Sequence, residues 1–116
     1  DYLDNPHDPV LIENGNILLY DNGTTRGYSR VIEVNPLTEK IEWSYGEAES
    51  ERFYSKTKGS VQRLPNGNTI IVNSNGYVFE ITPQREKVWE FYSYFSNQFK
   101  TIRHSLYRMP RWENFP

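Results

Sequence analysis

The sequence predicts an all-β protein, a partial β-propeller of about two four-stranded antiparallel blades. Short apolar runs, separated by Asn, Gly and Pro, fill positions 10–93. No window of about eleven residues keeps a helical period in its apolar positions. The motif Asn-Gly-Asn at 14–16 returns at 66–68, which indicates two copies of one structural repeat.

Each copy is expected to contain four strands, which occupy 10–13, 16–21, 28–34 and 40–46 in the first copy and 60–64, 68–73, 76–82 and 87–93 in the second. Both Asn-Gly pairs predict two-residue type I′ hairpins, because Asn and Gly tolerate positive φ. Asn35-Pro36 and Thr82-Pro83 open later turns, since Pro fixes its own φ and keeps the preceding residue extended.

The two copies also align beyond the shared hairpin: Val31, Glu33, Pro36 and Trp43 correspond to Val78, Glu80, Pro83 and Trp89. Each copy has roughly the 40 residues of one propeller blade, so we place the blades at about 7–46 and 59–93 within a single domain covering 1–116. The two Trp residues are interpreted as packing anchors.

Two blades do not close a ring, since propellers use about four to eight. The chain is therefore expected either to be a piece of a longer protein or to form a homo-oligomer that completes the ring. A self-contained sandwich of eight strands is the alternative fold. Residues 94–116 do not complete a third copy, and we expect a tail or the start of another blade there, with 101–107 as a candidate strand.

Composition excludes several classes of function. The 116 residues carry a formal net charge of -2 and no basic run, which argues against a nucleic-acid partner. No segment approaches the ~20 apolar residues of a membrane helix, and from the acidic composition of the first ten residues we expect no signal peptide among them. The chain has no Cys and two His, so we expect no disulfide, no metal site and no cofactor.

Function is expected where the copies differ, because the fold does not require those residues. His7-Asp8 lies opposite Gly59-Ser60, Asp21-Asn22-Gly23 lies opposite residues 73–75, and residues 24–27 are inserted only in the first copy. The Asp-Asn-Gly stretch lacks the alternating oxygen ligands and closing Glu of a calcium loop, so it predicts a turn.

His7 precedes the expected first strand of its copy, which is the innermost strand of a propeller blade. A neutral imidazole there can act as a nucleophile or general base, and Asp8 can hold its tautomer. An exposed loop histidine is the alternative. His104 has no neighbouring carboxylate and is expected at the surface.

Two arginines of the first copy suit a site for an anionic group. Arg26 and Arg30 can bind sulfate or phosphate oxygens through their guanidinium forks, although solvated strand charges explain them as well. Tyr28 and Tyr54 are expected in the core or in packing between blades.

The segments HDPVLIENGNILLYDNG, YSRVIEVNP, IEWSYG and GSVQRLPNGNTIIVNSNGYVFEITP resemble the bacterial arylsulfotransferase family that does not use the nucleotide sulfate donor. The resemblance runs from about His7 to Tyr92 and is weaker at 106–110. It implies a six-bladed propeller, often periplasmic, that transfers a sulfo group from an aryl sulfate to a phenol. A channel histidine, matched here by His7, would carry the group as sulfohistidine.

Two hypotheses follow from these observations. In the first, the intact protein is an arylsulfotransferase whose partners are small aryl sulfates and phenols; His7 is its nucleophile, Asp8 orients the imidazole, and Arg30, Tyr28 and Tyr54 contact the substrate. In the second, the chain is a non-catalytic propeller fragment or an interaction module. An extracytoplasmic location is implied by the resemblance alone.

Overall fold

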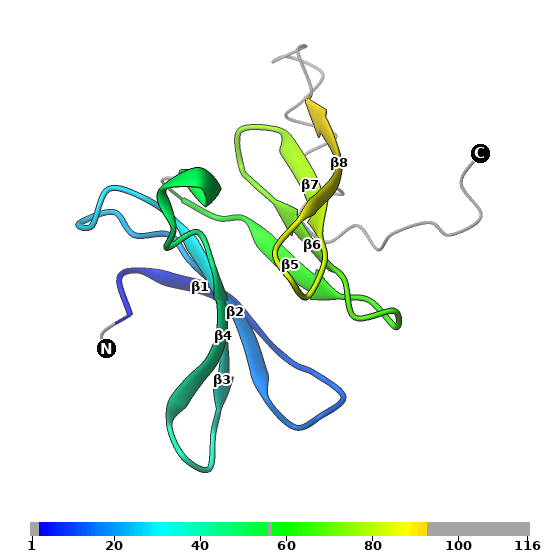
Figure 1. The fold of residues 1–116 in the computed structure, drawn as a ribbon. Coiled ribbons are helices and arrows are strands. Elements are labelled where there is room, and N and C mark those ends of the chain that lie inside the picture. Colours follow the sequence, from blue (N-terminus) through cyan, green and yellow to red (C-terminus); the bar gives the residue numbers. More distant parts are fainter. Residues whose placement is uncertain (1–2, 56, 93–116) are drawn as a thin grey trace.

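The computed structural model describes residues 3–55 and 57–92, which form eight strands and one short 3-10 helix (Figure 1). The strands are β1 (Pro6–Leu11), β2 (Ile17–Asp21), β3 (Arg30–Asn35), β4 (Lys40–Tyr45), β5 (Ser60–Arg63), β6 (Thr69–Val72), β7 (Tyr77–Ile81) and β8 (Lys87–Tyr92), and the helix η1 is Glu49–Glu51. They make two antiparallel sheets in the orders β1-β2-β3-β4 and β5-β6-β7-β8. The prediction of an all-β fold with two blade-like sheets is confirmed. The candidate strand at 101–107, the tail and His104 lie outside the described residues.

Strand register supports the proposed alignment of the copies. Leu18 of β2 pairs with Glu33, which pairs with Trp43 of β4. In the second sheet, Ile70 pairs with Glu80, which pairs with Trp89. The register shifts immediately after the glutamate in both sheets, so even the irregularity of the ladder is repeated.

The hairpin prediction was wrong in its turn type. Gly15 adopts φ 91°, whereas Asn14 is not among the residues with positive φ. The amide of Gly15 donates to the Ile12 carbonyl and the amide of Ile12 to the Asn16 carbonyl, both at 2.9 Å. The loop therefore has three residues, a type I turn followed by a left-handed glycine. Residues 64–68 repeat it, and there Pro65 fits the first turn position because its φ is fixed at a negative value.

The first strand begins earlier than the sequence predicted. β1 starts at Pro6 rather than Val10 and includes His7. Its pairing with β2 shifts between His7 and Val10, and Asp8 adopts φ 56°. This bulge keeps pairing on both sides of Pro9, which has no amide hydrogen for the ladder. His7 is therefore a strand residue, and the expectation that it precedes the strand was wrong.

The main core lies between the two sheets. One face of β1–β4 packs against one face of β5–β8, and the buried residues of this cluster are Leu18, Tyr20, Val31, Tyr45, Val61, Ile71, Tyr77, Phe79 and Ile81. Strands β1 and β2 both contact β5, so the first strands of the two sheets lie near each other (Figure 1). Neighbouring propeller blades are related in this way.

The two Trp residues pack as anchors but in different places. Trp43 packs against the main core, and its Nε1 donates to the Pro83 carbonyl of the other sheet at 3.2 Å. Trp89 packs against a second cluster on the outer face of β5–β8, and its Nε1 donates to Glu80 Oε1 at 2.7 Å. The same residue type thus joins two sheets in one copy and lies on the outer face in the other.

Candidate functional site

The structure places His7 at the edge of the core between the sheets. His7 is half-buried and pairs with Tyr20 of β2. Tyr20 is fully buried, and its hydroxyl donates to Asn73 Oδ1 of the second sheet at 2.5 Å. Paired residues on neighbouring strands project to the same face, so His7 lies on the face turned toward β5–β8.

Asp8 occupies the bulge that follows His7. Tyr20 and Val72 occupy equivalent positions in the two copies. On the neighbouring strand, Tyr20 pairs with His7 and Val72 pairs with Ser60. His7 therefore corresponds to Ser60, which shifts the sequence alignment by one position and makes the bulge specific to the first copy. Asp tolerates the left-handed conformation found at Asp8 better than most residues.

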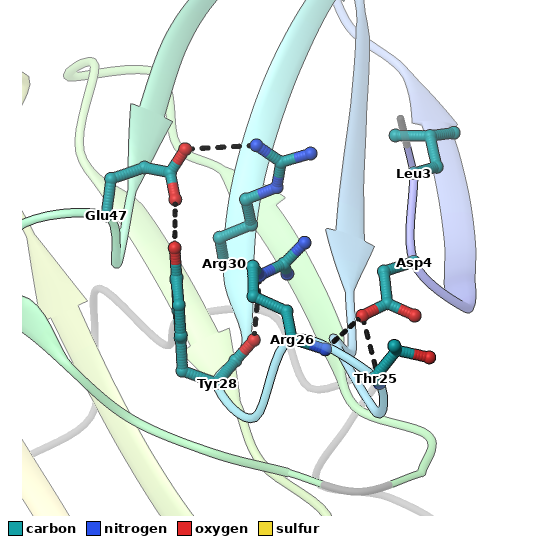
Figure 2. Close-up of a pocket in the computed structure, with 7 residues that line it drawn as sticks. All are labelled: Leu3, Asp4, Thr25, Arg26, Tyr28, Arg30 and Glu47. Atoms are coloured by element: carbon teal, nitrogen blue, oxygen red, sulfur yellow. Dashed lines mark hydrogen bonds and ion pairs between the residues drawn. The ribbon is translucent and has the colours of Figure 1, made fainter. Parts of the chain in front are cut away.

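Arg30 and Tyr28 do come together, in a pocket on another part of the first sheet (Figure 2). The open cavity of about 540 Å³ is lined by Leu3, Asp4, Thr25, Arg26, Tyr28, Arg30 and Glu47. These residues come from four places: the segment before β1, the loop between β2 and β3, the start of β3, and the segment after β4, where Glu47 lies. The insertion recognised in the sequence therefore builds one wall of the pocket.

Arg30 is buried and held by carboxylates. Its Nε lies 3.0 Å from Asp21 Oδ2, and its Nη1 lies 3.0 Å from Glu47 Oε2. Arg26 Nη1 approaches the same Asp21 oxygen at 3.2 Å. Side-chain exposure of 3% for Arg30 and 0% for Asp21 shows that Arg30 is not a solvated strand charge, which was the alternative reading of the sequence. The two guanidinium groups are balanced by the carboxylates around them.

Tyr28 is contacted by two cations. The guanidinium carbon of Arg52 lies 3.6 Å from the centre of the Tyr28 ring, and that of Arg26 lies 4.9 Å from it. Its hydroxyl donates to Glu47 Oε1 at 3.1 Å. Cation–π contacts and this hydrogen bond hold the ring in place. Figure 2 shows the hydroxyl of Tyr28 directed at Glu47.

Asp4 fastens the segment before β1 to the inserted loop. Its Oδ2 accepts hydrogen bonds from the amides of Arg26 at 2.7 Å and Thr25 at 3.0 Å. The Arg26 amide is the main reason that the pKa of Asp4 lies below its usual value, because it stabilises the charged form. The Asp4 amide in turn donates to Asp21 Oδ1 at 2.8 Å. This network positions the chain just ahead of His7.

Asn22 and Ser29 have a structural role that the sequence did not reveal. Asn22 Nδ2 donates to the carbonyls of Ser55 at 2.7 Å and Lys58 at 2.9 Å, while Ser29 Oγ donates to the Asn22 carbonyl at 2.8 Å. They hold the linker between the sheets. The sequence offered one indication of this role: both polar residues occur only in the copy that precedes the linker.

The predicted turn at Asp21-Asn22-Gly23 is only partly what forms, since Asp21 ends β2 and the turn residues are 24–27. Among residues 3–55 and 57–92, no group of three or more His, Asp or Glu side chains is arranged to hold a metal ion. A helix long and apolar enough to span a membrane is likewise not found in that part of the chain.

The predicted site residues fall into separate places. Across the first sheet, Pro6, Asp21 and Arg30 form one row of paired residues. The next row contains His7 and its partner Tyr20. Successive rows of a sheet project to opposite faces, so the structure does not bring Arg30 and His7 to one face. Tyr54 lies in the linker, is 40% exposed and is not among the residues that line the pocket.

The chain was compared with models of protein families. A family model described as arylsulfotransferase (ASST) matches residues 4–94, which include His7 and all eight strands. No curated protein matches the chain.

Proposed function

Because the chain belongs to the arylsulfotransferase family, we propose that its intact form transfers a sulfo group from an aryl sulfate to an acceptor phenol, with His7 as the nucleophile. The position of His7 is the observation that carries this proposal. His7 is half-buried on the first strand of its sheet and lies inside the matched region. The bulge at Asp8, directly after it, distinguishes the first copy from the second.

The proposed reaction has two displacements at sulfur. An unprotonated imidazole nitrogen of His7 attacks the sulfur atom, an S–N bond forms, and the aryl S–O bond breaks to release the donor as phenolate. The acceptor oxygen then attacks the same sulfur, the S–N bond breaks, and the imidazole returns to its starting form. The acceptor proton passes to the released phenolate, so charge and atoms balance.

The supporting residues have distinct proposed roles. We assign Asp8 to orientation of the imidazole, because it follows His7 at the bulge. Arg30 and Tyr28 are proposed as substrate contacts of the pocket, and Tyr54 as a contact from the linker. Because Arg30 projects to the face opposite His7, it is not proposed as a contact of the transferring sulfo group.

The small aryl sulfate and phenol are the proposed partners, and the proposed setting is extracytoplasmic, as in the family that the sequence resembles. Neither step of the proposed reaction requires a cofactor, since the donor itself carries the activated sulfo group. The remaining sheets of a ring are proposed to come from a longer chain or from further copies, because propellers contain about four to eight blades.

The test compares the native chain with His7→Asn, using a chromogenic aryl sulfate and an acceptor phenol. We expect the native chain to retain a sulfo group that peptide mass spectrometry maps to His7, and the variant to retain none. Leu37→Ser, in the exposed hairpin between β3 and β4, is the control and should behave as the native chain. Equal, measurable turnover in native and His7→Asn chains, or a sulfo group that maps to a residue other than His7, would overturn the proposal.

A non-catalytic scaffold is the second candidate function. It is favoured by the ion pairs that engage Arg26, Arg30 and Arg63 with carboxylates of the chain itself. A scaffold or interaction module predicts that neither the native chain nor any variant binds or turns over aryl sulfate, while the fold is retained.

A further inference from the structure

The four Asn-Gly pairs of the chain lie in two kinds of structural setting. Three of them occupy three-residue loops that share one hydrogen-bond pattern, in the segments 12–16, 64–68 and 73–77. In each of these loops the glycine has a positive φ, and its amide donates to the carbonyl three residues earlier. The fourth pair, Asn22-Gly23, lies in the connection between β2 and β3.

An Asn-Gly pair can lose ammonia without an enzyme. The backbone nitrogen of the glycine attacks the side-chain carbonyl carbon (Cγ) of the asparagine, a C–N bond forms, and the bond from Cγ to Nδ2 breaks. The departing nitrogen takes the proton of the attacking amide and leaves as ammonia, and the product is a five-membered succinimide ring. Water then opens the ring at one of its two carbonyl carbons, which gives aspartate or isoaspartate. Glycine favours the attack because it has no Cβ to hinder it.

The three loops differ in what holds the asparagine side chain. In all three the asparagine is exposed and its Oδ1 accepts from the amide two residues later, at 2.9 Å for Asn14, 2.9 Å for Asn66 and 3.1 Å for Asn75. Asn14 also donates from Nδ2 to Glu33 Oε2 at 3.1 Å. Within residues 3–55 and 57–92, Nδ2 of Asn66 and Nδ2 of Asn75 donate to no such acceptor. A hydrogen bond to a carboxylate is strong, so it fixes the amide group that has to turn toward the glycine nitrogen.

The fourth pair is held at both reacting groups. Asn22 is 2% exposed, and its Nδ2 donates to two carbonyls of the linker between the sheets. The Gly23 amide donates to the Asp4 carbonyl at 2.7 Å, whereas the corresponding bonds of the three loops measure 2.9, 2.9 and 3.1 Å. Ring closure at Asn22 therefore requires several buried hydrogen bonds to break together.

We propose that Asn66 and Asn75 are sites of spontaneous deamidation, whereas Asn14 and Asn22 are protected by the fold. The two reactive loops lie at the two ends of β6. Each loop has to open locally before the ring closes, because its glycine amide is hydrogen-bonded, and exposed loops open at low free energy. The reaction requires only water and is independent of sulfo transfer.

The two products affect the second sheet differently. Aspartate keeps a side-chain oxygen for the amide two residues later, so the loop is retained with one added negative charge. Isoaspartate routes the main chain through the former side chain and lengthens the loop by one methylene group. Loop length sets the register of a hairpin, and β6 supplies Ile70, Ile71 and Val72 to the two apolar clusters. Isoaspartate at either end should therefore loosen the packing of β6.

Peptide mass spectrometry of the native chain, incubated at mildly alkaline pH, measures the four conversions separately. We expect Asn66 and Asn75 to convert about tenfold or more faster than Asn14, the factor expected for one hydrogen bond to a charged group. Asn22 should convert least. In concentrated urea the four sites should convert at similar rates, because glycine follows the asparagine in each.

Glu33→Ala is the matched variant, because it removes the acceptor of Asn14 Nδ2. Conversion at Asn14 should rise toward that at Asn66. Arg63→Met removes the ion pair of Glu33 but leaves its bond with Asn14, so it controls for a general loss of stability and should leave Asn14 protected.

The proposal is overturned if, in the folded native chain, Asn14 or Asn22 converts as fast as either loop site of the second sheet. It is also overturned if Asn66 and Asn75 stay unmodified over a period in which all four sites convert in urea. An equal rise at Asn14 in Arg63→Met and Glu33→Ala would show that the bond to Glu33 does not protect it.

Discussion

The connections between the second and third strands differ sharply between the two sheets. Residues 22–29 join β2 to β3, whereas only residues 73–76 join β6 to β7. The longer connection fastens the segment before β1, through Gly23 N to the Asp4 carbonyl at 2.7 Å, which the shorter one does not. Both connections bond the linker between the sheets: Asn22 donates to the carbonyls of Ser55 and Lys58, and the Ser74 amide donates to Ser55 Oγ at 3.1 Å. Even Gly23 is constrained, since a Cβ there would overlap the Tyr28 carbonyl oxygen.

This difference separates two meanings of a residue present in one copy only. Asp21, Asn22, Ser29 and Arg30 distinguish the first copy, yet all four are buried and bonded within the chain. They support the strand that carries His7 and the linker beside it. A departure from the repeat thus marks a specialised region, within which only some residues are candidates for chemistry.

The strongest way to break the specialised region is to remove the charge of Arg30. Arg30→Met leaves Arg26 as the cation paired with the buried Asp21. We expect the free energy of unfolding to fall by about 3 kcal/mol. This is the lower end of the range for a broken buried ion pair, because Arg26 still compensates the charge of Asp21. Equilibrium unfolding in urea measures it. Arg85 pairs with Glu51, and its side chain is 48% exposed. Arg85→Met should therefore lower the free energy of unfolding by less than about 1 kcal/mol. Equal losses in the two variants would contradict the structural role given to Arg30.

A smaller effect is expected where the two sheets are joined by Tyr20. Burial raises the pKa of Tyr20, so its hydroxyl stays protonated and donates to Asn73. Tyr20→Phe leaves the buried Asn73 oxygen without this donor and should cost about 1–3 kcal/mol in urea unfolding. Tyr28→Phe, which loses a bond to the exposed Glu47, serves as the control and should cost less. A Tyr20 loss no larger than the Tyr28 loss would show that the contact does not hold the sheets together.

Much of the sheet architecture is predictable from the sequence because the repeat is strong. The predicted correspondence of Glu33 with Glu80 and of Trp43 with Trp89 agrees with the strand register, in which each glutamate pairs with the tryptophan of its own sheet; the bulge shared by the two sheets was not predicted. The turn type and the start of β1 were not predictable, because a left-handed Gly15 and a bulge at Asp8 depend on hydrogen bonds to the opposite strand.

The candidate site was predictable only in part. His7 and the insertion were recognised as special from the comparison of the copies. The sequence did not show that Arg30 and His7 project to opposite faces, since this follows from pairing in adjacent rows. It also did not reveal the ion pair of Arg30 with Glu47, which is 17 residues away and reaches Arg30 through the fold.

The smallest expected effect concerns the corner where Glu33 meets Arg63. Burial alone would raise the pKa of Glu33, but hydrogen bonds from Asn16 and Asn14 and the charge of Arg63 lower it below its ordinary value of 4.5. A lowered pKa in the folded state stabilises the fold fully above pH 4.5, and that stabilisation is lost as the pH falls through the folded-state value.

The thermal midpoint of Glu33→Gln should therefore lie below that of the native chain at neutral pH, with the difference shrinking as the solution is acidified below pH 4.5. Scanning calorimetry at several pH values measures this, with Glu86→Gln as a control at an exposed position. A difference that stays constant or grows on acidification would show that the ionised carboxylate of Glu33 does not hold the corner, and that the apolar faces join the sheets without it.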